Sequence, residues 1–240
     1  MSYNIIFNPT VEHLEELECW LKAEEVDTND GFYCNWPIIL KSFEKKDLVI
    51  LEYQKLAIGL LVYTVAELTV KIDIAEIKPD FRGRGLGKFF VDGFFEVIAK
   101  RGILVAELYC KPINSESIWK KLSFLNFPKF PNESKIMMYR VLVPASKPEE
   151  NLSSAAEVIE LWNDEPYLAM NQNPVWQWGI KYKLNSQELS LPIIHPACYE
   201  WQICWRTDQE IHVKDKIKRF DKAKIEYGNF IIIKELPIKN

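Results

Sequence analysis

LTVKIDIAEIKPDFRGRGLGKFFVDGFFEVIAKRG, residues 68–102, joins two different periodicities at a glycine-rich corner. Its first part alternates apolar and polar residues, which is typical of a β-strand with one buried face. Beyond the corner, apolar residues recur at the spacing of one helix face; they are Leu86, Phe89, Phe90, Phe94, Val97 and Ile98. The stretch therefore predicts a strand, a loop and a helix in succession.

The corner, residues 82–88, has the composition of an anion-binding loop. Glycines let the backbone approach a ligand closely, and the first N–H groups of a helix have no partner within that helix. The loop contains three glycines and three cations, Gly83, Gly85, Gly87, Arg82, Arg84 and Lys88. This arrangement favours a diphosphate over a neutral ligand. The alternative is an ordinary glycine helix start with solvated basic residues.

Two other phosphate-binding patterns do not fit this corner. A dinucleotide fold requires G-x-G-x-x-G with an acid about 20 residues later, and a P-loop requires Gly-Lys-Ser/Thr. The sequence has neither pattern here. The kind of anion-binding loop therefore has to be identified from the segments on both sides of the corner.

Composition is that of an ordinary soluble protein. With 240 residues, 48% of them hydrophobic, the chain can bury one large core or two modest ones. A net charge of −4 gives no positive field that would collect nucleic acid. Five cysteines without a C-x-x-C pair, and only three histidines, predict reduced thiols in a cytoplasmic protein and no metal site. We expect neither export nor a membrane partner, because no signal-like start or 18-residue apolar stretch is present.

Strand and helix patterns continue on both sides of residues 68–102. Upstream we expect a strand at 3–7, a helix capped by Thr10, a short helix at 38–43, and strands at 48–53 and 57–63. Downstream we expect a strand at 103–110, a helix at 117–122 and a closing strand at 135–143.

The corner resembles the acetyl-CoA-binding motif of the GCN5-related N-acetyltransferases (GNAT), Arg/Gln-x-x-Gly-x-Gly/Ala, which Arg82, Gly85 and Gly87 match. Residues 77–81, IKPDF, resemble the family's V-x-P-x-Y/F lead-in, and residues 119–124, WKKLSF, resemble its Y/W-x-K-L-G-F segment. The resemblance covers roughly residues 3–143. It implies an α/β (α+β) fold with a mixed central sheet and flanking helices, in which two central parallel strands splay apart around the pantetheine arm.

The resemblance also implies how acetyl-CoA is held. The loop binds the diphosphate, and a backbone N–H near Ile77 polarises the thioester carbonyl. Asn114 resembles the family's CoA-contacting asparagine, although it lies two positions closer to the Leu-x-Phe anchor. The implied CoA-binding residues are Ile77, Arg82, Gly83, Arg84, Gly85, Leu86, Gly87, Lys88, Asn114 and Trp119.

Acyl transfer to an amine needs a base, and two acids lie on the strand before the corner. Asp73 and Glu76 are three positions apart, so alternation places them on opposite faces and only one can face the cleft. We rank Asp73 first, because many small-molecule acetyltransferases of the family carry an acid there. For each of the two, the alternative is a solvated or salt-bridged strand carboxylate.

Three aromatic residues complete the predicted site. Trp119 stands where many family members have the tyrosine that protonates the leaving thiolate, and it has no acidic hydroxyl. Tyr109 is the candidate substitute, and unassisted release of the thiolate is the alternative. Tyr33 and Trp36 are candidate walls of the acceptor pocket, with ordinary core packing as the alternative.

Residues 151–240 predict a small all-β domain that follows a GNAT domain at residues 1–145. The connecting segment 144–154 is polar and contains prolines. Beyond it, strict alternation and turn signals indicate about seven short strands in an antiparallel sandwich or barrel. Five tryptophans lie there, and their alternation predicts core packing rather than a ligand platform. We expect the domain to restrict the acceptor or to contact another protein, homodimerisation being one version.

Together these features predict an acetyl-CoA-dependent N-acetyltransferase. The acceptor is a primary amine of a small molecule or peptide, attacking directly within a ternary complex. The alternative is a CoA-binding sensor or interaction protein that has lost catalysis on the same fold. Trp119 at the general-acid position is the evidence for that alternative.

Overall fold

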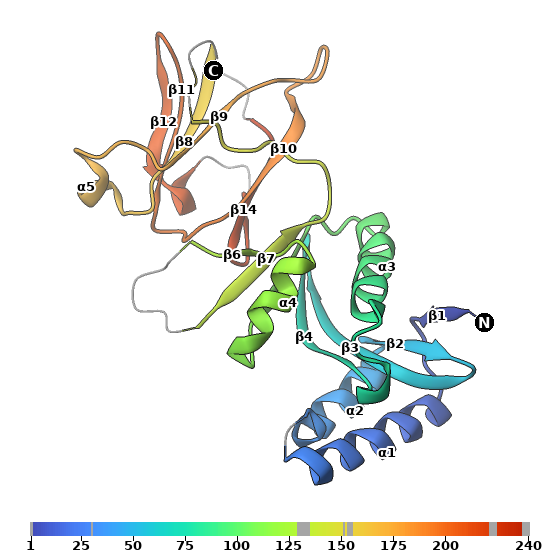
Figure 1. The fold of residues 1–240 in the computed structure, drawn as a ribbon. Helices are drawn as coiled ribbons and strands as arrows, with labels where there is room; N and C mark the ends of the chain where they lie inside the picture. Colours follow the sequence, from blue (N-terminus) through green and yellow to red (C-terminus); the bar gives the residue numbers. More distant parts are fainter. Residues whose placement is uncertain are drawn as a thin grey trace. The chain divides into compact units, whose positions relative to one another are not determined.

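The computed structural model describes residues 2–29, 31–128, 135–150, 152, 156–220 and 225–236. The chain divides into two compact units, whose helices and strands Figure 1 labels. Each unit has its own hydrophobic core. Unit 1 consists of Met1–Asn126 and Ser134–Leu142, and unit 2 of Phe127–Glu133 and Val143–Asn240. Of the predicted linker, residues 151, 153 and 154 lie outside the described residues.

Unit 1 is built on a seven-stranded mixed sheet. Its strands are β1 (Tyr3–Ile6), β2 (Leu48–Tyr53), β3 (Leu56–Ala66), β4 (Thr69–Ile77), β5 (Val105–Tyr109), β6 (Leu125–Asn126) and β7 (Met137–Val141). They lie in the order β1-β2-β3-β4-β5-β7-β6. Neighbouring strands are antiparallel except β4 and β5, which are parallel. This confirms the predicted mixed sheet, and β6 is an addition too short to produce an alternation signal.

Helices cover both faces of this sheet. They are α1 (Val11–Thr28), α2 (Trp36–Lys45), α3 (Leu86–Lys100) and α4 (Glu116–Lys121), with short 3₁₀ turns η1 (Tyr33–Asn35), η2 (Pro79–Phe81) and η3 (Ile113–Ser115). On one face, α3 buries Phe90 and Phe94 against the sheet. On the other face, α1 and α2 bury Leu17 and Ile39. No helix of the described residues combines the length and apolar character needed to cross a membrane.

Unit 2 contains two antiparallel sheets around one core. One sheet has the order β12-β11-β8-β9 and the other β10-β14-β13. The strands are β8 (Glu157–Leu161), β9 (Trp176–Gly179), β10 (Glu188–Pro196), β11 (Gln202–Thr207), β12 (Ile211–Lys216), β13 (Glu226–Tyr227) and β14 (Phe230–Glu235). The four-residue helix α5 (Pro166–Ala169) and the turn η4 (Ile217–Arg219) complete the unit. Residues from both sheets, such as Ile159, Trp178 and Ile231, share the core, which is the antiparallel arrangement that the alternation predicts.

The tryptophans of unit 2 pack as core residues. Trp162, Trp178, Trp201 and Trp205 are buried, and Trp176 is half-buried and stacks on Trp201 with ring centroids 5.8 Å apart. On β9 and β11, the period-two alternation turns the rings of Trp178 and Trp205 inward from the strands. The prediction of core packing is therefore confirmed for these residues.

A buried histidine lies among these rings. The ring of His195, on β10, packs against Trp176 with centroids 4.5 Å apart and against Trp178 with centroids 5.4 Å apart. Burial lowers the pKa of His195 from 6.5 to about 4. The folded state thus holds this imidazole neutral at a pH where the unfolded chain protonates it.

Unit 2 is expected to lose stability as the pH falls from about 6.5 towards 4. Over that window the unfolded state binds a proton that folded His195 does not, a linkage on the order of 3 kcal/mol. Urea unfolding followed by tryptophan fluorescence, at several pH values, measures it in the wild type and in His195→Leu. The difference in unfolding free energy between the two proteins should change across this window, and a pH-independent difference would contradict the argument.

Candidate functional site

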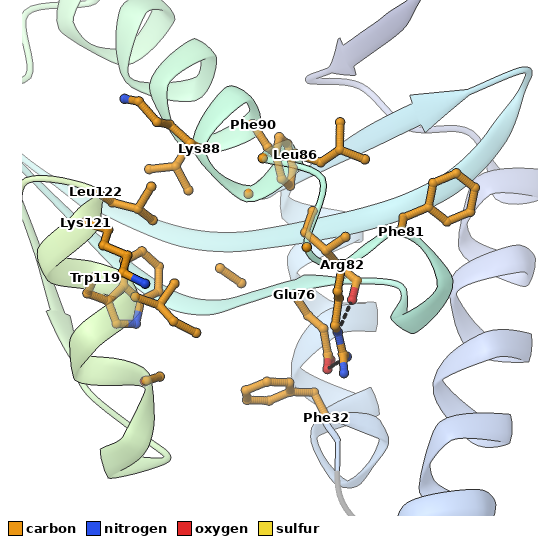
Figure 2. A pocket seen from close by; sticks show the side chains of 18 of the residues that line it. Phe32, Glu76, Phe81, Arg82, Leu86, Lys88, Phe90, Trp119, Lys121 and Leu122 are labelled. Carbon is orange, nitrogen blue, oxygen red and sulfur yellow. Dashed lines mark hydrogen bonds and ion pairs between the residues drawn. The ribbon is translucent and has the colours of Figure 1, made fainter.

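A cavity of about 800 Å³ opens in unit 1 between the end of β4, the corner before α3 and the segment around α4. Its walls come from Glu24, from Gly31 and Phe32, and from residues within the segments 75–77, 81–91, 112–115 and 118–122. Figure 2 shows these side chains converging on one space from strand, loop and helices. The size is within the range of small-molecule sites.

The sheet opens at this cavity because β4 and β5 pair over only part of their length. Parallel pairing runs from Thr69 opposite Val105 to Ile72 opposite Leu108, whereas β4 continues to Ile77. The later residues of β4 are paired with β3 alone, where Ile77 lies opposite Gly59. The edge of β4 that faces away from β3 is therefore open beside the cavity.

The direction of the backbone groups at this open edge follows from alternation. The N–H of Lys78 donates to the carbonyl of Ile58 on β3, at 2.9 Å. Successive N–H groups of a strand point to opposite edges, so the N–H of Ile77 points away from β3. The Ile77 carbonyl has the same direction and accepts a hydrogen bond from Arg82 Nε at 2.7 Å. Ile77, which lines the cavity, thus offers a backbone donor there.

The corner between β4 and α3 requires glycine at two positions. Gly83 has φ +74° and Gly85, the N-cap of α3, has φ +77°, conformations that other residues adopt with strain. Gly87 is different, because its backbone is helical and a Cβ there would have no atom within 4 Å. Neither backbone conformation nor packing within the described residues demands glycine at position 87. Its lack of a side chain keeps the cavity wall open at the N-terminus of α3.

Arg82 is turned towards carboxylates rather than towards the loop glycines. Its Nη2 donates to Glu76 Oε1 at 2.8 Å and to Glu24 Oε1 at 2.6 Å. The two glutamate side chains are only 7% and 6% exposed, while Arg82 is 46% exposed. Together with the bond to Ile77, the guanidinium connects β4 with the last turns of α1 (Figure 2 shows the Glu76–Arg82 pair).

The other two cations of the corner also have protein partners. Arg84 donates to the carbonyl of Asp80 at 2.7 Å and lies over the ring of Phe81. Lys88 pairs with Asp92 one helical turn later. Desolvation opposes ionisation of Asp92, but hydrogen bonds from Lys88 and Arg140 outweigh it and lower the pKa of Asp92. Lys88 lines the cavity, whereas Arg84 does not.

The two acids predicted on β4 lie in different surroundings. Asp73 accepts a hydrogen bond from Thr64 Oγ1 at 2.8 Å and pairs with Lys71 Nζ at 2.9 Å, and it is not a cavity residue. Glu76 does line the cavity. Of the two candidates, the second-ranked one therefore faces the site in this structure.

A β-bulge at the first of these two acids, Asp73, alters the alternation along β4. The register between β3 and β4 shifts between Val62 and Tyr63, so Asp73 is an extra residue that stands opposite no residue of β3 in the strand pairing. On either side of it, Ile72 packs in the core beneath α3 and Ile74 in the core beneath α1 and α2. Strict alternation would have placed these two isoleucines on the same face.

Of the three predicted site residues beyond α3, two line the cavity and one does not. Trp119 lines the cavity and packs edge-on against Phe124, with ring centroids 5.2 Å apart. Asn114 lines it from η3. Tyr109 lies outside the cavity lining, is 39% exposed and has Lys135 Nζ over its ring at 5.3 Å. The structure thus brings Trp119 and Asn114 to the site and Tyr109 elsewhere.

The aromatic wall comes from a neighbour of the predicted pair. Tyr33 and Trp36 stack on each other with centroids 6.2 Å apart and pack against the α1–α2 core without lining the cavity. Phe32 and Gly31 line it instead. Both residues lie next to the predicted pair in the chain, but the sequence carries no signal for which of these aromatic rings faces the cavity.

Comparison with known proteins yields matches among solved structures only. No protein-family model matches the chain, and no curated protein matches it in sequence. A PaiA N-acetyltransferase from Thermoplasma acidophilum, in complex with coenzyme A, is 18% identical with a TM-score of 0.47, covering 59% of this chain and 99% of its own. A GNAT-family acetyltransferase from Staphylococcus aureus Mu50 is 15% identical with a TM-score of 0.49, covering 59% and 100%.

An aminoglycoside 6′-N-acetyltransferase complexed with coenzyme A is 11% identical, with a TM-score of 0.47, and covers 60% of this chain and 98% of its own. All three structures are acetyltransferases, the class that the sequence motifs of this chain resemble.

The geometry at the end of β4 depends on Gly59 of β3. A Cβ added there would lie 2.7 Å from Ile77 Cδ1 and 3.1 Å from the carbonyl oxygen of Glu76. We expect Gly59→Ala to lower the unfolding free energy by about 1–3 kcal/mol, because the strand end must shift. Thermal unfolding measures this, with Gly87→Ala as the control that meets no atom and should be neutral or slightly stabilising. Equal melting temperatures for wild type and Gly59→Ala would refute close packing at this point.

Proposed function

We propose that the chain is an acetyl-CoA-dependent N-acetyltransferase whose acceptor is a primary amine that attacks the thioester directly. The observation that carries this proposal is that a glycine loop at a helix N-terminus, an open strand edge and a buried carboxylate meet at one cavity. Acyl transfer needs a held donor, a polarised carbonyl and a base, and these three features supply one each.

The residues at the corner fit coenzyme A. The N–H groups at the start of α3 and the open α-carbon of Gly87 suit close approach of a diphosphate. Lys88 and Lys121 line the same cavity and add positive charge. The open edge of β4 from Ala75 to Ile77 can pair with the amides of an extended pantetheine arm. When bound, acetyl-CoA supplies an activated acyl group.

The chain's own residues then handle charge and protons. The N–H of Ile77 points from the open edge and can stabilise negative charge on the thioester oxygen. Glu76, next to it in sequence, is the carboxylate that takes the amine proton directly or through one water. Arg82 holds the Glu76 side chain in place through its 2.8 Å hydrogen bond.

Release of the thiolate needs no tyrosine in this proposal. Trp119 has no acidic hydroxyl, and Tyr109 lies away from the cavity. A thiol has a pKa near 8.5, so a thiolate leaves near neutral pH with little penalty. The cavity residue Trp119 then acts as an apolar wall.

A second candidate function follows from the same tryptophan. A protein that binds CoA and reports its acylation state needs the loop and the cavity but no general acid. Release of free thiol in the presence of a panel of primary amines separates the two functions, because a sensor binds acetyl-CoA without turnover.

We also propose that unit 2 is a β domain with a role distinct from acetyl transfer, either restricting the acceptor or contacting another protein, including a second copy of the chain. Its support is a core of its own, built from residues such as Trp178, Ile203 and Ile233. Lys216 in this unit is paired with Glu165 and Glu200, at 2.6 Å each, which does not favour a phosphate-binding surface there.

Gly87→Leu is expected to keep the fold and weaken CoA binding by tenfold or more, because the new side chain fills the open wall at the start of α3. Isothermal titration with coenzyme A measures the affinity, and circular dichroism checks the fold. Glu96→Leu, an exposed position on the same helix outside the cavity, is the matched control. Unchanged affinity in Gly87→Leu would remove the loop from the proposed site.

Glu76→Gln is expected to lower kcat by about 10²–10⁴-fold, the contribution of a general base, while coenzyme A affinity stays the same. Higher pH should partly restore the rate, since more of the amine is then already neutral in solution. Thiol release gives the rate, and Asp73→Asn is the control outside the cavity. Loss of activity in Asp73→Asn but not in Glu76→Gln would assign the base to Asp73.

A further inference from the structure

A second buried carboxylate lies at the cavity, and only one of its two oxygens accepts a hydrogen bond from a described residue. Glu24 lies in the last turns of α1 with its side chain 6% exposed. Its Oε1 accepts the hydrogen bond from Arg82 at 2.6 Å. Its Oε2 is buried and has no hydrogen-bond partner among the described residues. A buried carboxylate oxygen without a donor costs free energy, so a donor supplied by a ligand would be stabilising.

The space beside this oxygen is kept clear by a glycine. A Cβ on Gly31 would lie 3.5 Å from the Glu24 carboxyl carbon and 3.8 Å from Oε2. Gly31, Glu24 and Phe32 all line the cavity. The Oε2 atom of Glu24 therefore lies beside the space that a side chain at position 31 would occupy, in the part of the cavity wall that these residues form. A compact head group such as an ammonium suits that space.

The neighbouring ring adds to the preference for a cation. Phe32 follows Gly31 and contributes its ring to the same cavity, where Figure 2 shows it next to Glu76 and Arg82. The face of an aromatic ring attracts a cation, and a carboxylate nearby gives a charge-assisted hydrogen bond. Carboxylate and ring thus select for positive charge at the α1 side of the cavity.

We infer that the acceptor carries two cationic groups, and that the one that does not react binds Glu24. This inference rests on the proposed function. The reacting amine has to be neutral when it attacks, and its proton goes to Glu76, whereas a group held by Glu24 has to stay protonated to keep its ion pair. One amine cannot do both at once. Because Arg82 Nη2 contacts both glutamates, the two carboxylates lie close together, and a short aliphatic diamine spans them.

The test compares two acceptors of equal length, 1,4-diaminobutane and 1-aminobutane, with the wild type and Glu24→Gln. In the wild type, the KM for the diamine should be at least about tenfold below that for the monoamine, the value of one buried charge-assisted hydrogen bond. In Glu24→Gln this ratio should fall towards one. Asp27→Asn, an exposed position of the same helix outside the cavity, removes the same charge and should keep the wild-type ratio.

Equal KM values for the two amines in the wild type, or a ratio that persists in Glu24→Gln, would overturn the inference while acetylation itself still supports the proposed function. If neither amine is acetylated, calorimetric titration of 1,4-diaminobutane into the protein with coenzyme A decides the point. Binding that Glu24→Gln weakens tenfold supports the diamine site even though the proposed catalysis fails. No binding, or binding indifferent to that substitution, overturns it.

Discussion

The guanidinium of Arg82 holds together the elements that form the cavity. It joins β4 through Glu76 and the Ile77 carbonyl to α1 through Glu24, with all three distances between 2.6 and 2.8 Å. Exposed ion pairs contribute about 0–1 kcal/mol, whereas breaking a buried pair costs about 3–5 kcal/mol. Both glutamates are more than nine-tenths buried and Arg82 is about half exposed. The contribution of this cluster to the free energy of unfolding is therefore expected to lie between those two values. Its main effect is to fix the position of the strand end relative to α1.

The open edge of β4 is the second constraint on the site. A strand that stayed paired on both edges would have no backbone donor for a ligand. Here β5 ends at Tyr109 while β4 runs on past the bulge at Asp73, and the bulge increases the twist that carries the two strands apart. Gly59 lets β3 follow β4 closely at this point. The geometry of the end of β4 and of the loop that follows it is thus determined by a few positions between residues 59 and 87.

Much of unit 1 could be predicted because its signals are local. The glycine corner, the helix after it and most strands follow from spacing alone, and the structure has them within a few residues of the expected bounds. The bulge could not be predicted, since Ile72 and Ile74 look like one buried face when helices cover both faces of the sheet. Glu24 was also missed, because an acid in an amphipathic helix is ordinarily solvated, and only the fold brings Arg82 across 58 positions to meet it. The place of Phe127 in unit 2 likewise depends on a contact far apart in sequence, with the ring of Phe230.

The burial of two carboxylates at one cavity bears on what the cavity is for. Replacing a buried ionic cluster by apolar residues of similar size is often neutral or stabilising, so stability alone gives no reason for Glu24 and Glu76 to be there. The rest of the wall is largely apolar, with Phe90, Trp119 and Leu122 among its residues. In such surroundings each charge acts strongly on whatever enters, because little water screens it. A site that has to choose a cation and remove one proton from it has a use for both glutamates, and a single guanidinium between them leaves room for that cation.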